Sequence, residues 1–292
     1  MSTLLLVNPA AGRGAGRTLA GKVQTCLREL GIDFDTEFTR APREAIEIVE
    51  HGTSTHDAIL VAGGDGTWFE AVNGAMRAPQ RPRLGLIPIG TGNDFAKMLG
   101  FGNDWREACQ RIAAGHTRAV DIGRCNQDYF ANGAGIGFDA QVSREARRIR
   151  YLRGNAVYLL AVMRTLLLRY ATPEVTIEHD TGTLQQTITL VAAANGRCYG
   201  GAFRIAPDAE IDDGYLELVC ARGLGRLHIL RLLPKVLAGR HIGDPAITML
   251  RTRRVTIRST VPLPLHLDGE VIADEAMHLD IEILPQALNV FA

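Results

Sequence analysis

The sequence predicts an α/β protein in which a doubly wound parallel sheet is followed by a second, mostly antiparallel β-sandwich domain. Two observations predict this fold class. Up to about residue 122, short apolar runs alternate with helical stretches, which is typical of a parallel sheet covered by helices on both faces. After Asp121, strand-like segments follow one another with fewer helices between them, which favours antiparallel pairing. We therefore expect one domain over residues 1–124 and a second over 125–279, with the tail 280–292 returning to the first.

The first domain alternates between short strands and amphipathic helices. The expected strands are Leu4–Val7, Phe34–Thr39, Ala58–Ala62, Leu84–Ile87 and Thr117–Ile122. The expected helices are Thr18–Leu30, Pro42–His51, a stretch ending at Met76, a stretch ending at Leu99, and Trp105–Ala114. Because parallel strands all point the same way, their carboxyl ends are expected at one edge of the sheet.

The second domain is expected to consist mainly of strands. They are Tyr129–Ala134, Val175–His179, Thr187–Ala194, Tyr215–Cys220, Arg254–Ser259 and Leu263–Leu267. Two helices, at roughly Gly154–Tyr170 and Arg226–Ala238, interrupt this series. The boundary between the domains is therefore a change of pattern and not of composition.

Composition excludes several classes of protein. The 292 residues are 46% hydrophobic and 22% charged, as in an ordinary globular protein, and the zero net charge gives no electrostatic case for nucleic-acid binding. The five cysteines lack zinc-ligand spacing, which indicates reduced thiols. The N-terminus does not resemble a signal peptide and no run of 18 apolar residues occurs, so we expect a cytoplasmic protein.

Three Gly-rich loops follow three of the expected strands in the first domain. They are Asn8–Gly14, Gly63–Thr67 and Gly90–Asp94. Glycines let backbone N–H groups approach an anion closely, and the helix that follows adds its positive N-terminal end. A single loop of this kind often does no more than close a tight turn. Three of them at one edge of a sheet predict a phosphate-binding site.

The loops match neither of two common nucleotide-binding fingerprints. The pattern G-x-x-x-x-G-K-[ST] is absent, and Gly12-Arg13-Gly14 lacks the rest of G-x-G-x-x-G. A P-loop NTPase and an ordinary NAD dehydrogenase are therefore both disfavoured.

The string G-G-D-G-T at Gly63–Thr67 resembles the signature shared by diacylglycerol kinases, sphingosine kinases and NAD kinases. Other segments resemble the diacylglycerol/lipid-kinase branch in particular. They are Val7-Asn8-Pro9, Pro88–Ala96, Ala206-Pro207 with Asp212-Asp213-Gly214, and Leu267-Asp268-Gly269-Glu270. The matches extend from residue 7 to residue 270 in the expected order, so the chain is identified as a member of this family.

The resemblance implies an ATP-dependent kinase that uses Mg²⁺ and transfers the γ-phosphoryl group to a hydroxyl of a diacylglycerol-like lipid. The lipid is expected in a cleft between the domains. Glu270, with Asp268 beside it, is implied as the carboxylate base, whereas the residues alone predict only an Asp-Gly hairpin turn. Asp65 and Thr67 would lie nearest the phosphates. The nucleotide-binding residues, from the loops and the resemblance together, would be Asn8, Pro9, Gly12, Thr39, Gly63, Gly64, Asp65, Gly66, Thr67, Glu70, Thr91, Asn93 and Asp94.

The resemblance also implies a structural Mg²⁺ site at the acidic turn before the strand Tyr215–Cys220. Asp213 would supply a side-chain oxygen, and Glu210 and Tyr215 would supply their carbonyl oxygens. A small set of carboxylate and carbonyl ligands suits Mg²⁺. The alternative interpretation of the same residues is a plain acidic turn.

One segment departs from the family pattern. After G-G-D-G-T the family usually has a small or aliphatic residue, then Asn, then Glu, whereas this chain has Trp68-Phe69-Glu70. The missing amide implies altered nucleotide contacts, an altered acceptor or a loss of activity. The alternative is that Phe69 only packs at the start of its helix.

Membrane contact is a further expectation. An arginine run precedes the apolar helix that ends at Tyr170, and it consists of Arg144, Arg147, Arg148, Arg150 and Arg153. Cations beside an apolar segment suit a peripheral contact with an anionic lipid surface. The alternative is a solvated helix face followed by a core helix, and the apolar helix Leu227–Leu237 has the same two interpretations. The resemblance adds the expectation of a homodimer.

Two other functions remain open at this point. An NAD kinase shares the G-G-D-G-T loop, but the sequence offers Asn132-Gly133 and Asn195-Gly196 in place of an Asn-Glu pair. A non-catalytic lipid- or nucleotide-binding regulator with the same fold is favoured only by Phe69. The eight histidines are scattered, and none is given a function.

Overall fold

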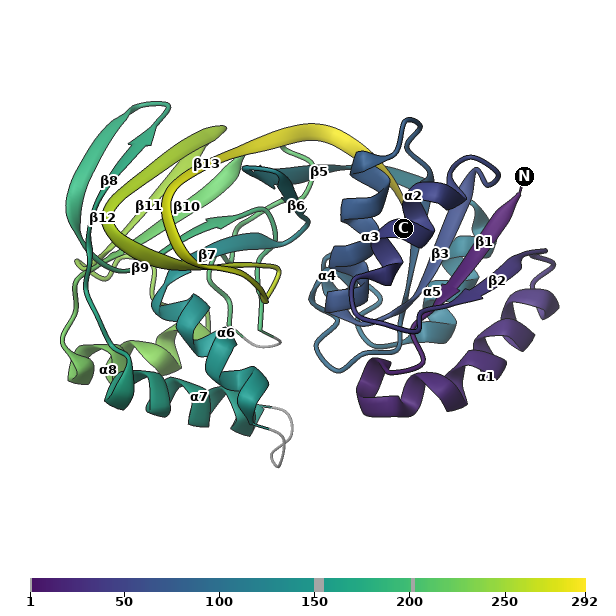
Figure 1. Cartoon of the computed structure of the whole chain (residues 1–292), viewed down its shortest axis with the longest axis horizontal. Helices are drawn as coiled ribbons and strands as arrows, with labels where there is room; N and C mark the ends of the chain where they lie inside the picture. The colour runs from purple at the N-terminus through teal and green to yellow at the C-terminus, as the bar shows by residue number, and fades with distance from the viewer. Residues whose placement is uncertain (1, 150–154, 201–202) are drawn as a thin grey trace. The chain divides into compact units, whose positions relative to one another are not determined.

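The computed structural model describes residues 2–149, 155–200 and 203–292 (Figure 1). The chain divides into two compact units. The first unit comprises the residues up to Ile122 together with Gln286–Ala292, and the second comprises Gly123–Pro285.

The first unit is built on a parallel sheet. Its strands lie in the order β2 (Asp35–Phe38), β1 (Thr3–Val7), β3 (Ala58–Gly63) and β4 (Arg83–Pro88). The end of β13 (Glu270–Phe291) extends this sheet by pairing Val290 with Leu84 of β4. Every residue of β1 is buried, as expected for a strand that is covered on both faces.

Helices cover both faces of this sheet. A 3₁₀ turn, Ala11–Gly14, leads into α1 (Ala15–Glu29), which packs with α5 (Trp105–Ala114) against one face through Val23, Leu27 and Cys109. The helices α2 (Glu44–Gly52) and α3 (Asp65–Arg77) pack against each other, and α2 contacts β1. The short helix α4 (Asp94–Met98) follows β4. The predicted doubly wound fold class is confirmed.

The second unit is mostly antiparallel. Its main sheet has the order β11 (Ile247–Thr252), β10 (Leu216–Arg222), β9 (Gly182–Ala194), β7 (Gly133–Gly137), β12 (Arg254–Leu267) and β13. The strand β8 (Glu174–His179) pairs with both β9 and β12, while β6 (Asp128–Phe130) pairs with β5 (Thr117–Cys125). Three helices, α6 (Phe138–Arg148), α7 (Asn155–Leu168) and α8 (Arg226–Leu237), share one hydrophobic cluster in this unit.

Several elements of the second unit differ from those expected. The predicted strand Tyr129–Ala134 is two strands, β6 and β7, while the two predicted strands after Arg254 form one strand with irregular pairing after Arg258. The strands β11 and β13 and the helix α6 were not predicted. The sequence of α6 is strongly polar, so its apolar positions do not stand out as a helical pattern. Only four of its side chains are buried, namely Phe138, Ala140, Val142 and Glu145.

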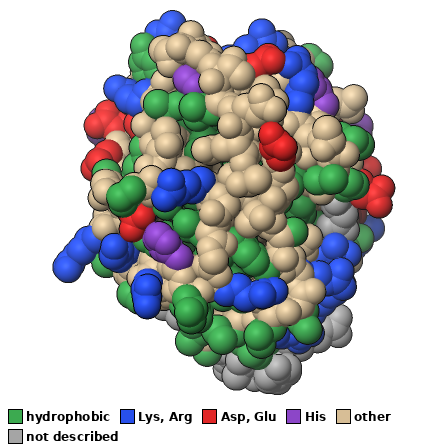
Figure 2. Space-filling model, turned by 90° about the vertical axis from the view of Figure 1, so that its left-hand side faces the viewer, with side chains coloured by type: hydrophobic (Ala, Val, Ile, Leu, Met, Phe, Trp, Pro, Cys, Tyr) green, Lys and Arg blue, Asp and Glu red, His purple; other side chains and the backbone are tan. Residues whose placement is uncertain are grey.

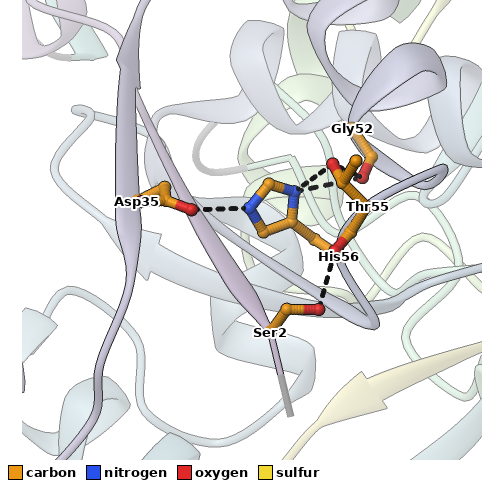
Figure 3. A network of polar contacts seen from close by, with 5 residues as sticks. All are labelled: Ser2, Asp35, Gly52, Thr55 and His56. Carbon is orange, nitrogen blue, oxygen red and sulfur yellow. Dashed lines mark hydrogen bonds and ion pairs between the residues drawn. The ribbon is translucent and has the colours of Figure 1, made fainter.

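A network of polar contacts around His56 illustrates how the histidines serve the fold (Figure 3). The Nε2 atom of His56 lies 3.1 Å from a carboxylate oxygen of Asp35, and its Nδ1 atom lies 2.9 Å from the hydroxyl of Thr55. The hydroxyl of Ser2 donates to the carbonyl of Thr55 at 2.8 Å. These residues precede β1, begin β2 and precede β3, so the network ties the amino ends of three strands, opposite the Gly-rich loops.

Candidate active site

The Gly-rich loops of the first unit approach each other too closely for side chains. A Cβ atom on Gly90 would lie 2.5 Å from the Cα atom of Gly64. Gly12 has a φ of +58°, and a Cβ atom there would lie 2.6 Å from the carbonyl oxygen of Ile89. The loops after β1, β3 and β4 therefore pack backbone against backbone, which explains the glycines at these positions.

Asp65 joins the loop after β3 to the loop after β4. Its carboxylate accepts hydrogen bonds from the backbone N–H groups of Asn93 and Asp94, at 2.7 and 2.6 Å. Burial, and then the nearby carboxylate of Asp94, raise the pKa of Asp65 to about 6. The Asp94 carboxylate accepts from the ammonium of Lys97 at 2.7 Å. Two carboxylates held this close together favour a cation at this edge of the sheet.

Asn8 joins the first loop to the second. Its side-chain amide donates to the hydroxyl of Thr67 at 2.8 Å, and its amide oxygen accepts from the N–H of Ala10 at 2.9 Å. Thr67 is buried, and a Cβ atom on Gly63 would lie 2.4 Å from the Cβ atom of Thr67. The structure thus brings residues from all three loops together at the carboxyl ends of the strands.

The other predicted nucleotide-binding residues lie on the same edge. Thr39 directly follows β2, and its N–H donates to the carbonyl of Val7 at 3.0 Å. Glu70, on α3, accepts from the N–H of Arg43 at 3.0 Å. Thr91 is exposed. Pro9 and Gly66 belong to the first and second loops.

The aromatic pair that departs from the family pattern points into the first unit. Trp68 and Phe69 are 1% and 3% exposed, and the indole of Trp68 stacks on the ring of Phe95 with centroids 5.2 Å apart. The side-chain amide of Asn73 donates to the carbonyl of Phe69 at 2.9 Å. Of the interpretations considered for Phe69, packing at the start of its helix agrees with this burial.

In the second unit, Asp268 and Gly269 form the tight turn between β12 and β13. Their φ angles are +50° and +86°, and Leu267 pairs with Glu270 across the turn. Two successive residues with positive φ are typical of a type I′ hairpin, which explains the Asp-Gly sequence.

The carboxylate of Asp268 holds this turn against the loop between β6 and β7. It accepts three backbone N–H groups, from Ala131, Asn132 and Gly133, each at 2.8 Å. The residue is 7% exposed, and burial raises its pKa to about 6 although the three donors oppose the shift. Asp268 is thus directed at the backbone of its own unit.

Glu270 is directed outward. Its side chain is 38% exposed and forms an ion pair with Arg147 of α6. The predicted arginine run therefore divides: Arg147 pairs with Glu270, while Arg148 pairs with Glu145 at 2.7 Å. Arg150 and Arg153 lie outside the described residues.

At the predicted Mg²⁺ site, both carboxylate oxygens of Asp213 already contact other groups of the protein. One oxygen of Asp213 accepts from the N–H of Tyr215 at 3.0 Å, and the other pairs with Arg251. Arg251 also lies 3.3 Å from Glu217. Among the described residues, no group of three or more His, Cys, Asp or Glu side chains has the arrangement of a metal site. One carboxylate and two carbonyls are a kind of donor set that Mg²⁺ accepts, but Asp213 would have to leave Arg251 to bind a metal ion, so this site stays a prediction.

An apolar cavity of about 110 Å³ lies in the second unit. It is lined by α6, α7 and α8 on one side and by β9, β10 and β11 on the other. Among the described residues, Asp139 is the one charged residue in its lining, and the hydroxyl of Tyr199 lies 2.7 Å from that carboxylate. The main apolar lining residues are Val142, Val162, Leu224, Ile229, Leu232 and Leu233. Sequence reasoning missed this cavity because its walls come from segments far apart in the chain.

The comparisons with known proteins match both units. The family model described as "Diacylglycerol kinase catalytic domain" matches residues 2–125. The family model described as "YegS C-terminal NAD kinase beta sandwich-like domain" matches residues 133–292. The diacylglycerol kinases of Bacillus subtilis and Staphylococcus carnosus are 32% and 31% identical, each over 91% of this chain and over 88% and 87% of their own lengths. The chain belongs to the diacylglycerol kinase family. The family assignment made from the motifs is therefore confirmed.

Solved structures agree with this assignment. A diacylglycerol kinase from Bacillus anthracis has a TM-score of 0.76 and 25% identity, with 99% of this chain and 96% of that chain covered. Yeast NADH kinase, solved in complex with NADH, shares the fold alone, at 12% identity and a TM-score of 0.52, covering 99% of this chain and 82% of its own. Membership of this kinase family implies a phosphotransferase with a nucleotide substrate. In the described part of the chain, every helix is too short or too polar to cross a membrane.

Proposed function

We propose that the protein is a Mg²⁺- and ATP-dependent kinase that phosphorylates the free hydroxyl of a diacylglycerol-like lipid. One observation carries the choice of acceptor. The unit that presents the exposed carboxylate of Glu270 also contains an apolar cavity with a single charged residue, Asp139, in its wall. The apolar lining suits hydrocarbon, of which a volume of about 110 Å³ holds one segment of an acyl chain, and it does not suit the polar ribose groups of NAD.

The first unit supplies the nucleotide site in this proposal. The loops that carry Asn8, Thr67 and Asp65 place backbone N–H groups at the carboxyl ends of the strands, where phosphates bind. Of the acidic residues at this edge, Asp65 and Asp94 are the two that would face the metal bound to the nucleotide. When bound, Mg²⁺ neutralises the negative charge that develops on the phosphate oxygens during transfer.

Glu270 is the proposed general base. Its carboxylate is accessible and held in place at one end of β13, and Arg147 fixes its orientation. Phosphoryl transfer needs a group that orients the acceptor hydroxyl and takes its proton, and a carboxylate performs both tasks. Asp268 acts in the same turn, where it holds the backbone that presents Glu270.

A peripheral membrane contact belongs to the same proposal. On α7, Leu159, Met163 and Leu167 recur at intervals of four residues and are exposed, so they form one outward stripe. Leu227 of α8 is 71% exposed. Figure 2 shows hydrophobic side chains next to Lys and Arg side chains on the lower part of the face, where Figure 1 labels α8.

These two helices also line the cavity from their inner sides, with Val162 on α7 and Leu232 on α8. A lipid surface against the outer stripe would therefore place the acceptor next to the cavity. We also propose a homodimer, on the family resemblance alone, which light scattering after size-exclusion chromatography tests. The proposed location is the cytoplasm, with reversible binding at the inner membrane surface.

The test is transfer of labelled γ-phosphate from ATP to diacylglycerol in mixed micelles, with sphingosine and NAD in parallel reactions. We expect label in phosphatidic acid and its loss in Glu270→Gln, with the affinity for ATP unchanged. Label in NAD would identify an NAD kinase instead. ATP binding without label in any acceptor would support a non-catalytic regulator.

A further inference from the structure

His266 lies directly beneath the turn that carries Glu270. It precedes Asp268 by two residues in β12, and its side chain is fully buried. Its Nδ1 atom accepts a hydrogen bond from the N–H of Gly269 at 3.1 Å. The turn is thus held from two sides, by the Asp268 carboxylate and by this imidazole.

The hydrogen bond from Gly269 fixes the protonation pattern of the ring. Because Nδ1 accepts, the proton of the neutral imidazole resides on Nε2. That Nε2 atom lies 3.4 Å from the carboxylate oxygen Oδ2 of Asp139, and it has no hydrogen-bond partner among the described residues. Asp139 therefore faces the Nε2 edge of the ring, the place from which a carboxylate orients the histidine in other catalytic arrangements.

Tyr199 completes the arrangement. Its hydroxyl donates to the same oxygen of Asp139 at 2.7 Å, and its ring meets the imidazole edge to face, with centroids 4.9 Å apart. A side chain at Gly135 would collide with Asp139 and His266. A Cβ atom there would lie 2.1 Å from Asp139 Oδ2 and 2.2 Å from His266 Nε2. The glycine of β7 thus leaves the space in which the two groups meet.

The order of contacts leads from the cavity to the turn. Tyr199 and Asp139 line the apolar cavity, Asp139 faces His266, and His266 binds the N–H of Gly269 next to Glu270. Stability alone gives little reason for such a chain, since apolar groups of similar volume stabilise a core as well as a buried polar pair does. The chain does provide a fixed geometry between the cavity wall and the exposed carboxylate.

We propose that Tyr199, Asp139 and His266 are positioning residues that set the location of Glu270 relative to the acceptor cavity. This inference rests on the proposed kinase function. None of the three touches the reacting atoms in this proposal. Their contribution is to hold the turn, so their loss lowers the rate of phosphoryl transfer and leaves ATP binding intact.

Two substitutions of His266 separate the role of the Nδ1 acceptor from that of the volume of the side chain. In His266→Asn the amide oxygen takes the place of Nδ1 as acceptor for Gly269, whereas His266→Leu removes the acceptor. We expect His266→Leu to lower kcat for diacylglycerol about 10- to 100-fold with the KM for ATP unchanged. His266→Asn keeps the acceptor but loses the contact with Asp139, so its kcat should fall between those of the parent and His266→Leu. Tyr199→Phe should lose about 3- to 10-fold because the ring then relies on a less fixed Asp139.

His241→Leu is the matched control. His241 is also a buried histidine of the second unit, but its Nε2 atom contacts the carbonyl of Ile205 and not the turn. This variant should lose stability and keep kcat. Hydrogen exchange of the Gly269 amide gives a readout independent of turnover: protection should be lost in His266→Leu and kept in His266→Asn.

The outcomes distinguish the two proposals. A parent protein that phosphorylates no lipid refutes the kinase function, and hydrogen exchange still tests the contacts of the turn. If the parent is active, a folded His266→Leu variant with parental kcat overturns the positioning role, as does His266→Asn that fails as badly as His266→Leu. Should His266→Leu not fold, an unchanged kcat in Tyr199→Phe overturns the proposal.

Discussion

Replacement of Gly90 by alanine tests the close packing of the phosphate loops. The new Cβ would lie 2.5 Å from Gly64 Cα and 2.7 Å from Asn93 Oδ1, whereas ordinary contact begins at 3.4 Å. The neighbour at Gly64 is backbone and cannot rotate away. The two loops must therefore separate by about 1 Å, which exceeds what a hydrogen bond of normal length tolerates.

This separation would weaken the hydrogen bonds from the loop after β4 to Asp65. Its hydrogen bonds to the N–H groups of Asn93 and Asp94, now 2.7 and 2.6 Å, would lengthen to about 3.6 Å and no longer count as hydrogen bonds. Each bond to a charged group contributes about 1.5–3 kcal/mol. Losing the equivalent of one bond costs about 2 kcal/mol, which corresponds to roughly a 30-fold loss of ATP affinity if the whole cost appears there.

Isothermal titration with ATP and thermal unfolding measure how this cost divides between binding and stability. Gly21→Ala in α1 is the matched control. Apart from its own helix backbone and chain neighbours, no atom of the described residues lies within 4 Å of the new Cβ, and alanine is the better helix former. It should raise stability by up to about 1 kcal/mol and leave ATP binding alone. A Gly90→Ala variant with parental ATP affinity and parental stability would refute the packing described for the loops.

Three further predictions concern electrostatics, the cavity and the membrane. Burial and Asp94 raise the pKa of Asp65 from 3.8 to about 6, so the folded protein binds this proton more tightly than the unfolded chain does. The protonated carboxyl therefore contributes stability that is fully present below about pH 4 and is lost as the pH rises through 6. Asp65→Asn lacks that contribution, so the variant's loss of unfolding free energy relative to the parent should be about 1 kcal/mol larger at pH 5 than at pH 7 in urea titrations; a pH-independent difference would contradict the shifted pKa. Val162→Phe should reduce the cavity and raise the KM for long-chain diacylglycerol about tenfold with an unchanged KM for ATP, whereas equal effects on both substrates would argue against the cavity as the acyl site. Leu227→Glu should lower activity on anionic vesicles and spare activity toward a short-chain acceptor in micelles, and vesicle binding equal to the parent's would remove α8 from the membrane contact.

The fold class and the family can be predicted from the sequence alone. Both depend on information that is local along the chain. The buried run Leu4–Val7 and the loop Gly63–Thr67 can be recognised without knowing what packs against them, because strand period and turn chemistry are properties of a few consecutive residues. The Asp-Gly turn at Asp268 was recognised for the same reason, and the structure contains it as a hairpin.

The contacts that those local features make depend on tertiary packing. Asp268 looked like a partner of the base in sequence, yet its carboxylate binds three backbone N–H groups more than 130 residues away. The link from Tyr199 through Asp139 to His266 joins three different segments, and nothing in any one of them indicates the other two. The apolar cavity likewise exists only once helices and strands distant in the chain have packed together. Local pattern indicates the fold class and the motifs, while the contacts between distant side chains, and hence the geometry around Glu270, arise only from the packing of the elements.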